Sequence, residues 1–297
     1  MIVPWRDRRG NFLPFKAAVL AAGFIPGLWY AFWWITGEAG GRPVTEAIHG
    51  TGLWTIRFLL ISLAITPAAR MLNWPALLLV RRMVGLTGLA YGLTHLFLYT
   101  LDQKFALGTV VGEIVQRFYL TIGFVTLLGL SLLGATSTNN MIRRMGRWWK
   151  RLHRLVYPLV ALGTLHYFIQ SKANVSEPVF VAGLYAWLMV WRLLPMGWQR
   201  GLAVYPALAV LAGFVTAGIE FAWYGLATRI NPWRVLAANG SIDFGLRPAH
   251  WVFVAGLVVA TLVVARRFSG FRSSGPTPAR TGYASSEMRP SRPARSA

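Results

Sequence analysis

Two stretches decide the fold of this chain, RRMVGLTGLAYGLTHLFLYTLDQ at residues 81–103 and RLHRLVYPLVALGTLHYFIQ at residues 151–170. Each is a mainly apolar run of about 20 residues, the length that crosses a ~30 Å hydrocarbon layer as a helix. Each begins on basic residues and carries a histidine in its apolar part, His95 or His166. Working outward, similar runs predict an all-α integral membrane protein, a helical bundle of about eight transmembrane helices. The expected spans are residues 15–36, 50–69, 83–101, 118–135, 152–170, 178–194, 203–225 and 250–266.

The composition supports a membrane protein. The 297 residues are 55% hydrophobic and only 13% charged, whereas soluble domains carry about 25% charged residues. The N-terminus continues into a full-length span, so no cleavable signal is expected. Cysteine is absent, which excludes disulfides, thiolate-ligated clusters and a cysteine nucleophile. A bound metal would therefore need histidine, carboxylate or carbonyl ligands.

The net charge of +21 reflects topology. Most of the 30 lysines and arginines lie at the N-terminus, in alternate loops and in the C-terminal tail. The positive-inside rule then places both termini and the basic loops in the cytoplasm. We therefore expect contact with anionic lipid and no nucleic-acid partner.

The depth of the histidines points to a cofactor. His95 lies thirteen residues beyond Arg82 and His166 twelve beyond Arg154, each on a helix rising from the basic side. At 1.5 Å per residue both reach about 20 Å, in the outer half of the bilayer. Histidines at matching depth on two helices can supply both axial ligands of a b-type haem. Such ligation leaves no open iron position and suits electron transfer better than oxygen chemistry.

Glycines accompany His95. Gly85, Gly88 and Gly92 share its helix face, where small residues would let a flat macrocycle approach the backbone. The alternative is that these glycines serve helix–helix packing.

A third histidine, His153, lies at the basic end of the fifth span, about 20 Å from His166. It could bind a second haem. Against this, an ideal helix turns the two side chains about 140° apart, although Pro158 could distort the helix. The third span offers Arg81 and Arg82 at that depth, which could pair with haem propionates or a phosphate. The alternative is an interfacial histidine in a basic cluster.

The other candidate residues have several interpretations. His49 begins the second span and could bind a propionate, a quinone or a partner, or cap the helix. His250 is expected at the membrane interface. Glu220, the one carboxylate deep in a predicted span, could move protons or be a hydrogen-bonded structural residue. No internal repeat is apparent.

Three segments together resemble the MsrQ (formerly YedZ) family of the ferric-reductase-like transmembrane superfamily. They are HGTGLWTIRFLLISLAITPAAR at 49–70, RRMVGLTGLAYGLTHLFLYTLDQ at 81–103 and TSTNNMIRRMGRWWKRLHRLVYPLVALGTLHYF at 136–168. The resemblance covers about residues 10–195, and the third segment is the most specific.

The resemblance implies a haem-binding bacterial inner-membrane subunit of the MsrPQ system. In that system MsrQ passes electrons from the quinone pool, or from a cytosolic flavin reductase, to MsrP, a periplasmic molybdopterin enzyme that reduces methionine sulfoxide in oxidised proteins. The family is associated with haem b and FMN. By position, His95, His153 and His166 match the family's haem-associated histidines, and His49 matches its second-helix histidine.

The resemblance also suggests domain limits. Residues 1–200 would form the six-helix ferric-reductase-like haem-binding core, residues 201–267 an extension with two further spans, and residues 268–297 a disordered basic cytoplasmic tail. Two other interpretations stay open. One is a quinol-linked cytochrome b subunit of another membrane oxidoreductase, and the other is a non-haem membrane transporter whose histidines are incidental.

Overall fold

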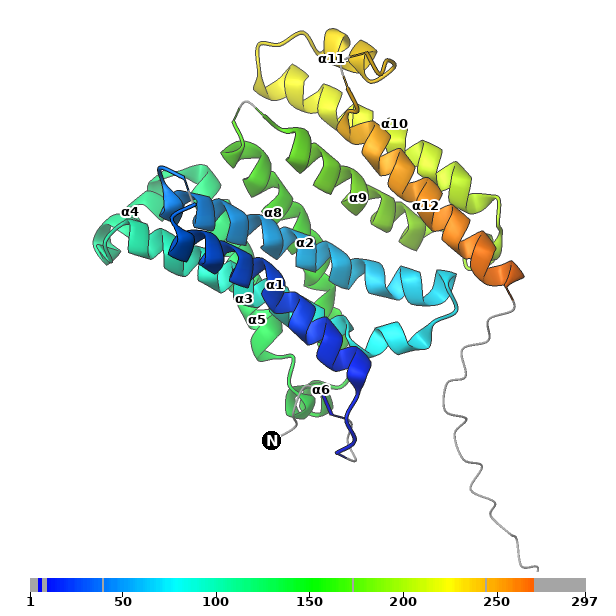
Figure 1. Cartoon of the computed structure of the whole chain (residues 1–297), viewed down its shortest axis with the longest axis horizontal. Coiled ribbons are helices and arrows are strands. Elements are labelled where there is room, and N and C mark those ends of the chain that lie inside the picture. Colours follow the sequence, from blue (N-terminus) through cyan, green and yellow to red (C-terminus); the bar gives the residue numbers. More distant parts are fainter. Residues whose placement is uncertain (1–4, 7–9, 39, 173, 244, 270–297) are drawn as a thin grey trace, which may run out of the picture.

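The computed structural model describes residues 5–6, 10–38, 40–172, 174–243 and 245–269, and long helices dominate them (Figure 1). In chain order these are α1 (Pro14–Thr36), α2 (Pro43–Met71), η1 (Pro75–Leu79), α3 (Arg81–Asp102), α4 (Leu107–Gln116), α5 (Phe118–Ala135), α6 (Asn139–Met145), α7 (Arg147–Leu152), η2 (His153–Leu155), α8 (Val156–Gln170), α9 (Ser176–Leu193), η3 (Trp198–Arg200), α10 (Val204–Ala227), α11 (Pro232–Ala238) and α12 (Pro248–Phe268). Residues 270–297 of the tail expected to be disordered lie outside the described residues.

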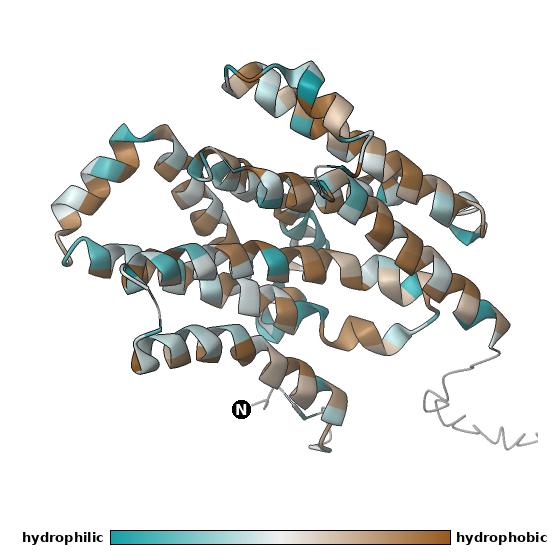
Figure 2. Ribbon diagram, turned by 45° about the horizontal axis from the view of Figure 1, so that its top comes forward, coloured by the Kyte–Doolittle hydropathy of each residue, from teal (hydrophilic) through white to brown (hydrophobic). Residues whose placement is uncertain are grey.

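Each of the eight expected spans corresponds to a helix, and the all-α membrane fold is confirmed. Within the described part of the chain, six helices are long and apolar enough to cross a membrane, namely α1, α2, α3, α5, α10 and α12. The other two expected spans are α9 and α8, which has only 15 residues. Figure 2 shows hydrophobic residues along the long helices and hydrophilic residues concentrated near helix ends and in loops.

The interior is built around α2. Its residues Ile56, Leu59 and Leu60 are buried against side chains of α5, α8 and α9. The outward faces are apolar as well, and on α1 the side chains of Phe24 and Leu28 are 60% and 65% exposed. Apolar side chains both inside and outside are expected of a bundle whose solvent is hydrocarbon.

The fifth expected span is broken, so the expectation of one continuous helix over residues 152–170 is wrong. A 3₁₀ turn, η2, separates α7 from α8 and contains His153. Pro158 lies in the first turn of α8, where the proline ring and its missing N–H are tolerated at a helix start. The 140° separation of His153 and His166 therefore does not apply.

The C-terminal helices pack onto the rest of the molecule. α10 and α12 lie beside α9 (Figure 1). At one end the Arg266 Nε donates a hydrogen bond to the Leu72 carbonyl at the end of α2, over 3.3 Å. Near that connection Phe15, at the start of α1, packs against Trp74, with ring centroids 5.6 Å apart. The start of α1 and the end of α12 thus lie at the same end of the bundle.

Candidate metal-binding site

The structure brings His95 of α3 and His166 of α8 together. Their ring centroids are 6.4 Å apart and their planes are nearly perpendicular, at 81°. Both rings are only partly exposed, and their carbonyl partners Ile48 and Tyr119 lie near the starts of α2 and α5. The two histidines singled out by depth therefore face one site.

Hydrogen bonds orient both rings in the same way. The Nδ1 of His95 lies 2.8 Å from the carbonyl oxygen of Ile48, and the Nδ1 of His166 lies 2.8 Å from that of Tyr119. A carbonyl only accepts hydrogen bonds, so each Nδ1 must carry the proton. In the neutral form of each ring, Nε2 then keeps its lone pair, the arrangement in which histidine binds a metal while a carbonyl fixes its tautomer.

Two glycines, neither predicted from the sequence as a site residue, make room for these rings. A Cβ atom on Gly52 of α2 would lie 3.0 Å from the Nδ1 of His95. A Cβ atom on Gly123 of α5 would lie 2.9 Å from both the Nδ1 and the Cε1 of His166. A Cβ atom at either position would force the imidazole to shift. No signal short of the helix pairing could have shown this.

The site is built twice, so the expectation of no internal repeat is wrong for these four helices. One set is Ile48, Gly52, Thr55, Gly92 and His95, and the other is Tyr119, Gly123, Thr126, Gly163 and His166. Each residue of the second set lies 71 positions after its counterpart. The contacts repeat too, since a Cβ atom on Gly92 or on Gly163 would lie 3.4 Å from the methyl carbon of Thr55 or of Thr126. We call these the α2–α3 half and the α5–α8 half of the site. The repeat is hard to detect in the sequence because only a few, widely spaced residues are shared between the two sets.

The donor set fits iron in a macrocycle better than a metal held by protein alone. Among the described residues no group of three or more His, Asp or Glu side chains could hold a metal ion. Two imidazoles need the remaining ligands from elsewhere, as a porphyrin supplies them. With metal–nitrogen bonds of about 2 Å, two Nε2 ligands on one metal place their ring centroids about 6 Å apart. The observed 6.4 Å agrees with that requirement.

The glycines on α3 have side-chain neighbours. A Cβ atom on Gly88 would lie 3.3 Å from Leu59 and Phe58 of α2, and one on Gly92 would lie 3.1 Å from Leu127 of α5. These are the contacts of helix–helix packing. A role for Gly88 and Gly92 in cofactor contact stays a prediction.

His153 is placed differently. Its ring stacks on Trp149 at 3.9 Å, its Nδ1 lies 3.1 Å from the Trp149 carbonyl, and its Nε2 lies 3.2 Å from the Ser137 hydroxyl. Burial lowers the pKa of His153 below its usual range. Since both ring nitrogens have protein partners, a metal at Nε2 would have to displace Ser137.

Arg81 and Arg82 lie close to His153 but bind protein groups. The Arg81 guanidinium donates to the Thr66 hydroxyl over 3.1 Å, and that of Arg82 donates to the Asn139 side-chain oxygen over 2.7 Å. Both side chains are exposed. They can reach an anionic group at this end only by leaving or sharing these partners.

The remaining histidines have distinct positions. α2 begins at Pro43 with Arg42 as its N-cap, so the interpretation of His49 as a helix cap is wrong. His49 is exposed and lies within electrostatic range of His95. His250 caps α12 instead, because its Nδ1 accepts the Arg247 N–H over 3.0 Å and its Nε2 lies 3.0 Å from the Asn239 carbonyl.

Glu220 has the contacts of a structural residue. It is 1% exposed, its Oε1 lies 2.5 Å from an Arg247 nitrogen, and its Oε2 accepts from the Asn239 amide over 2.8 Å. These bonds tie α10 to the end of α11 and the start of α12. A buried carboxylate with both oxygens bound by protein groups is held in place, which favours the structural interpretation over proton movement.

Comparison with known proteins gives one consistent family. Residues 51–164 match the family model of the ferric reductase like transmembrane component. A protein-methionine-sulfoxide reductase heme-binding subunit MsrQ of Rhodospirillum rubrum is 43% identical over 192 residues, covering 64% of this chain and 90% of the relative. Proteins of the same name from Caulobacter vibrioides and Brucella anthropi are 41% and 40% identical, covering 59% of this chain in both cases and 84% and 79% of the relatives.

No solved structure matches the chain. The relative from Rhodospirillum rubrum nevertheless aligns over nine tenths of its own length. The family model covers α3 and α5 completely and the larger parts of α2 and α8, the four helices that form the histidine site. From these matches, the chain belongs to the MsrQ family.

Proposed function

We propose that the chain is a haem b electron-transfer subunit in which His95 and His166 are the axial ligands of one haem. The observation that carries this is the pair itself. Two imidazoles on different helices have ring centroids 6.4 Å apart, and each is oriented by a carbonyl at Nδ1. The relatives are named heme-binding subunits, in agreement with this chemistry.

The protein's own residues set the conditions of the site. His95 and His166 hold the metal, and the carbonyls of Ile48 and Tyr119 keep both rings in one tautomer and orientation. Apolar side chains of α2, α5 and α8 form a buried core between these helices. The haem supplies reversible one-electron chemistry when bound, and bis-histidine ligation leaves no position for oxygen.

The partner follows from the relatives' names, which assign them to a protein-methionine-sulfoxide reductase. In our proposal electrons pass to an MsrP-like periplasmic molybdopterin reductase, which carries out the chemistry on oxidised proteins. The donor is the quinone pool or a cytosolic flavin reductase. The chain would lie in the bacterial inner membrane with both termini and the basic loops in the cytoplasm.

We also propose a second cofactor position at the end of the bundle that carries Arg81, Arg82 and His153, here called the basic end. His153 would serve a second haem, or FMN would bind there with its phosphate on Arg81 and Arg82. What supports this is the proximity of Arg81 to His153 and the exposure of both arginines. His49, near His95, would contact a haem propionate, a quinone or the partner.

The test is a dithionite-reduced minus oxidised visible spectrum of detergent-purified protein, with haem measured as its pyridine complex. We expect a low-spin b-type spectrum that is lost in His95→Ala and in His166→Ala, because each variant removes one of two axial bonds. His250→Ala is the matched control, since it removes a histidine that caps α12 far from the site.

A colourless wild-type protein after expression with ample haem would overturn the proposal and favour the transporter interpretation. A coloured protein that does not pass electrons to a molybdopterin methionine sulfoxide reductase would instead favour a cytochrome b subunit of another oxidoreductase.

A further inference from the structure

Three arginines from distant parts of the chain converge where α9 turns into α10. Arg200 lies in η3, within the α9–α10 connection, and its carbonyl accepts a hydrogen bond from the Arg267 guanidinium at the end of α12. Arg70, in the last turn of α2, contacts the same connection, because its guanidinium lies 4.0 Å from the sulfur of Met196. All three arginine side chains are exposed. We call Arg70, Arg200 and Arg267 the arginine cluster.

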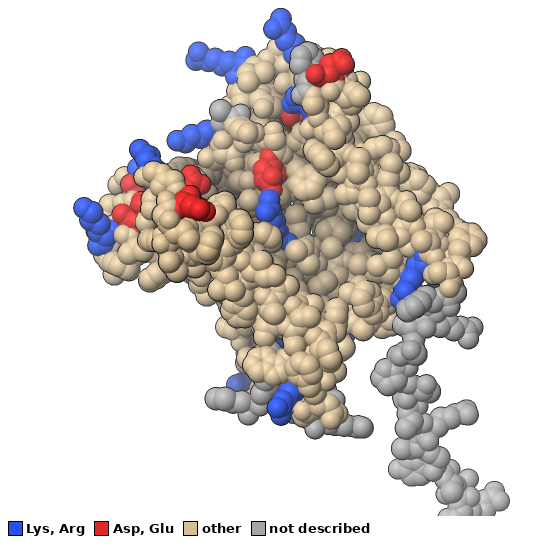
Figure 3. Space-filling model, in the orientation of Figure 1, with Lys and Arg blue, Asp and Glu red and all other residues tan. Residues whose placement is uncertain are grey.

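No acidic side chain balances the arginine cluster within the described part of the chain. The ion pairs found there are Arg57–Glu177, Arg117–Glu113 and Arg247–Glu220. On the face drawn in Figure 3, the acidic side chains gather toward the end of the bundle that bears α4 and α11, whereas a basic side chain lies beside the end of α12. Like charges so close together repel one another unless an anion lies among them. The cluster therefore favours an anionic ligand.

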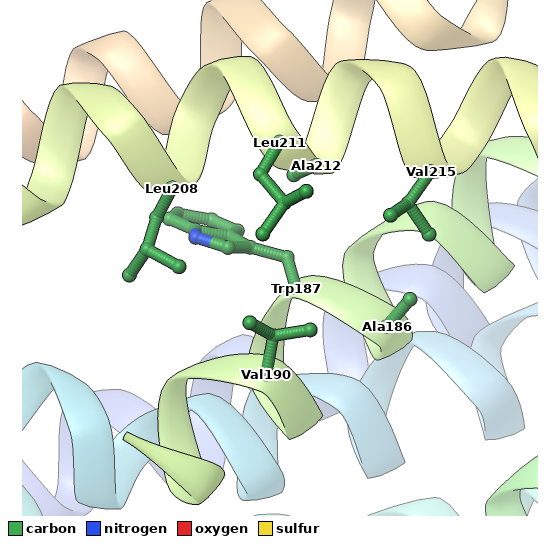
Figure 4. Close-up of a pocket in the computed structure, with 7 residues that line it drawn as sticks. All are labelled: Ala186, Trp187, Val190, Leu208, Leu211, Ala212 and Val215. Atoms are coloured by element: carbon green, nitrogen blue, oxygen red, sulfur yellow. The ribbon is translucent and has the colours of Figure 1, made fainter. Parts of the chain in front are cut away.

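An apolar crevice lies between α9 and α10, close to the arginine cluster. It holds about 180 Å³ of space, and its lining is Ala186, Trp187, Val190, Leu208, Leu211, Ala212 and Val215 (Figure 4). Val190 and Leu208 lie about 6 Å or less along their helices from the ends that the α9–α10 connection joins. Leu211 is 46% exposed, so the crevice opens toward the surrounding hydrocarbon.

One polar group in the crevice lacks a partner. The Trp187 indole nitrogen is buried, and among the described residues it has no hydrogen-bond acceptor. Figure 4 shows the indole ring between Leu208 and Leu211, with its nitrogen turned toward Leu208, the side nearer to the connection. Trp187 lies six residues before the end of α9, about 9 Å along the helix. A buried N–H without an acceptor is costly, so a ligand carbonyl at this depth would be stabilised.

We propose that the arginine cluster and the crevice together bind one anionic phospholipid from the leaflet at this end of the bundle. Its phosphodiester contacts the three arginines, an ester carbonyl accepts the Trp187 N–H, and an acyl chain lies along the crevice. Charged phosphate, ester carbonyl and hydrocarbon follow one another in a phospholipid in the same order as their partners follow one another here. Trp198, 64% exposed in the connection, is the kind of residue that marks the membrane–water boundary.

The apolar part of the site selects a lipid over a soluble anion. A free phosphate would meet the exposed arginines and leave both the crevice and the Trp187 N–H unfilled. The charge of the cluster selects among lipids, because a zwitterionic head group carries an ammonium that offsets the attraction of its phosphate. Guanidinium groups form paired hydrogen bonds with phosphate oxygens. Basic pockets between membrane helices at the cytoplasmic side bind acidic head groups in this way.

The site lies at the junction between α2 and the C-terminal helices. Arg70 belongs to α2, Arg200 to the connection that leads into α10, and Arg267 to the end of α12. A head group that contacts all three would link these elements across their shared end. The bound lipid would therefore stabilise the packing of α10 and α12 on the rest of the bundle, a role that does not depend on the proposed haem.

The test is native mass spectrometry of the full-length protein in detergent, titrated with phosphatidylglycerol and with phosphatidylethanolamine of the same acyl chains. We expect the wild type to prefer phosphatidylglycerol. Arg70→Gln, Arg200→Gln and Arg267→Gln should each weaken its binding about five-fold, the scale of one arginine near an anionic head group, and the triple variant about 100-fold. Trp187→Phe, which keeps an aromatic ring and removes the donor, should weaken it about five-fold.

The matched control is the triple variant Arg143→Gln, Arg144→Gln, Arg151→Gln, which removes the same number of exposed charges from α6 and α7. Equal weakening in this control would overturn the inference, because charge alone would then suffice. So would equal affinity of the wild type for both lipids, or displacement of the lipid by inorganic phosphate at equal concentration. The wild-type comparison needs no variant and holds even if one fails to fold. A protein that prefers phosphatidylglycerol and contains no haem would refute the proposed function alone.

Discussion

The α2–α3 half and the α5–α8 half of the histidine site share what an imidazole ligand needs. In each half a carbonyl of the first helix lies 2.8 Å from Nδ1, and one turn later a glycine gives the ring its space. The two halves differ in which helix carries the large side chain at the helix–helix contact. In one half Gly88 of the second helix meets Phe58, whereas in the other Gly129 of the first helix meets Leu159.

The difference separates two kinds of requirement. The carbonyl that orients each ring and the glycine that leaves space for it are repeated with little change. At the helix–helix contact, by contrast, the glycine and the large side chain have changed places between the two helices. This exchange keeps the two helices of each pair close, because the combined volume of the two facing side chains stays about the same. Arg57 has no charged counterpart in the α5–α8 half, where Leu128 stands 71 positions on. Its charge is therefore not needed to orient either imidazole.

The largest expected difference between variants of the two halves is at the clearance glycines. Gly123→Ala places a methyl group 2.9 Å from two ring atoms of His166, whereas in Gly52→Ala the nearest His95 atom is 3.0 Å away and the third is 3.8 Å away. We expect about ten-fold weaker haem retention for Gly123→Ala, the scale seen when the surroundings of a metal ligand are disturbed, and a smaller loss for Gly52→Ala. Haem per polypeptide after dialysis against apomyoglobin measures both.

Gly112→Ala controls for substitution itself, since nothing lies within 4 Å of a Cβ atom there. Full haem retention in Gly123→Ala would show that His166 can move and still ligate, and that the clearance is not required.

A smaller effect on haem content is expected for His153 than for His95 or His166. We expect His153→Ala to keep the spectrum of the haem proposed at His95 and His166. His153 contacts Ser137, just beyond the end of α5, whereas His166 contacts Tyr119 at the start of α5. If the basic end holds a second haem, the content falls from about two haems to about one. Pyridine haemochrome assays on the same preparations check this. Loss of all haem in His153→Ala would contradict the separation of the two ends.

Much of this was predictable from the sequence, and the remainder has a common physical cause. The apolar runs predict the eight main helices, and the 1.5 Å rise places His95 and His166 at one level because both helices start from basic residues on the same side. The Nδ1 partners of both histidines lie 47 residues away in the chain. Nothing local to either histidine could identify them.

The break at His153 was only partly predictable. Pro158 signals that an α-helix cannot continue unchanged, but a proline permits either a kink or a new helix start. The choice depends on tertiary contacts such as the stacking of His153 on Trp149. The roles of Gly52 and Gly123 could not be predicted for a similar reason, since each glycine leaves space for an imidazole on a different helix.

The smallest expected effect concerns the paired threonines. The Thr55 and Thr126 hydroxyls donate to carbonyls of their own helices, those of Thr51 and Ile122, over 2.9 and 2.8 Å. Each hydroxyl is therefore satisfied within its helix, and Thr55→Val or Thr126→Val should change the free energy of unfolding by less than about 1 kcal/mol. We expect no change in haem content or midpoint potential, measured by spectroelectrochemistry. A shifted potential in one variant alone would mean that its hydroxyl turns toward the cofactor, and that the two halves are less alike than their contacts indicate.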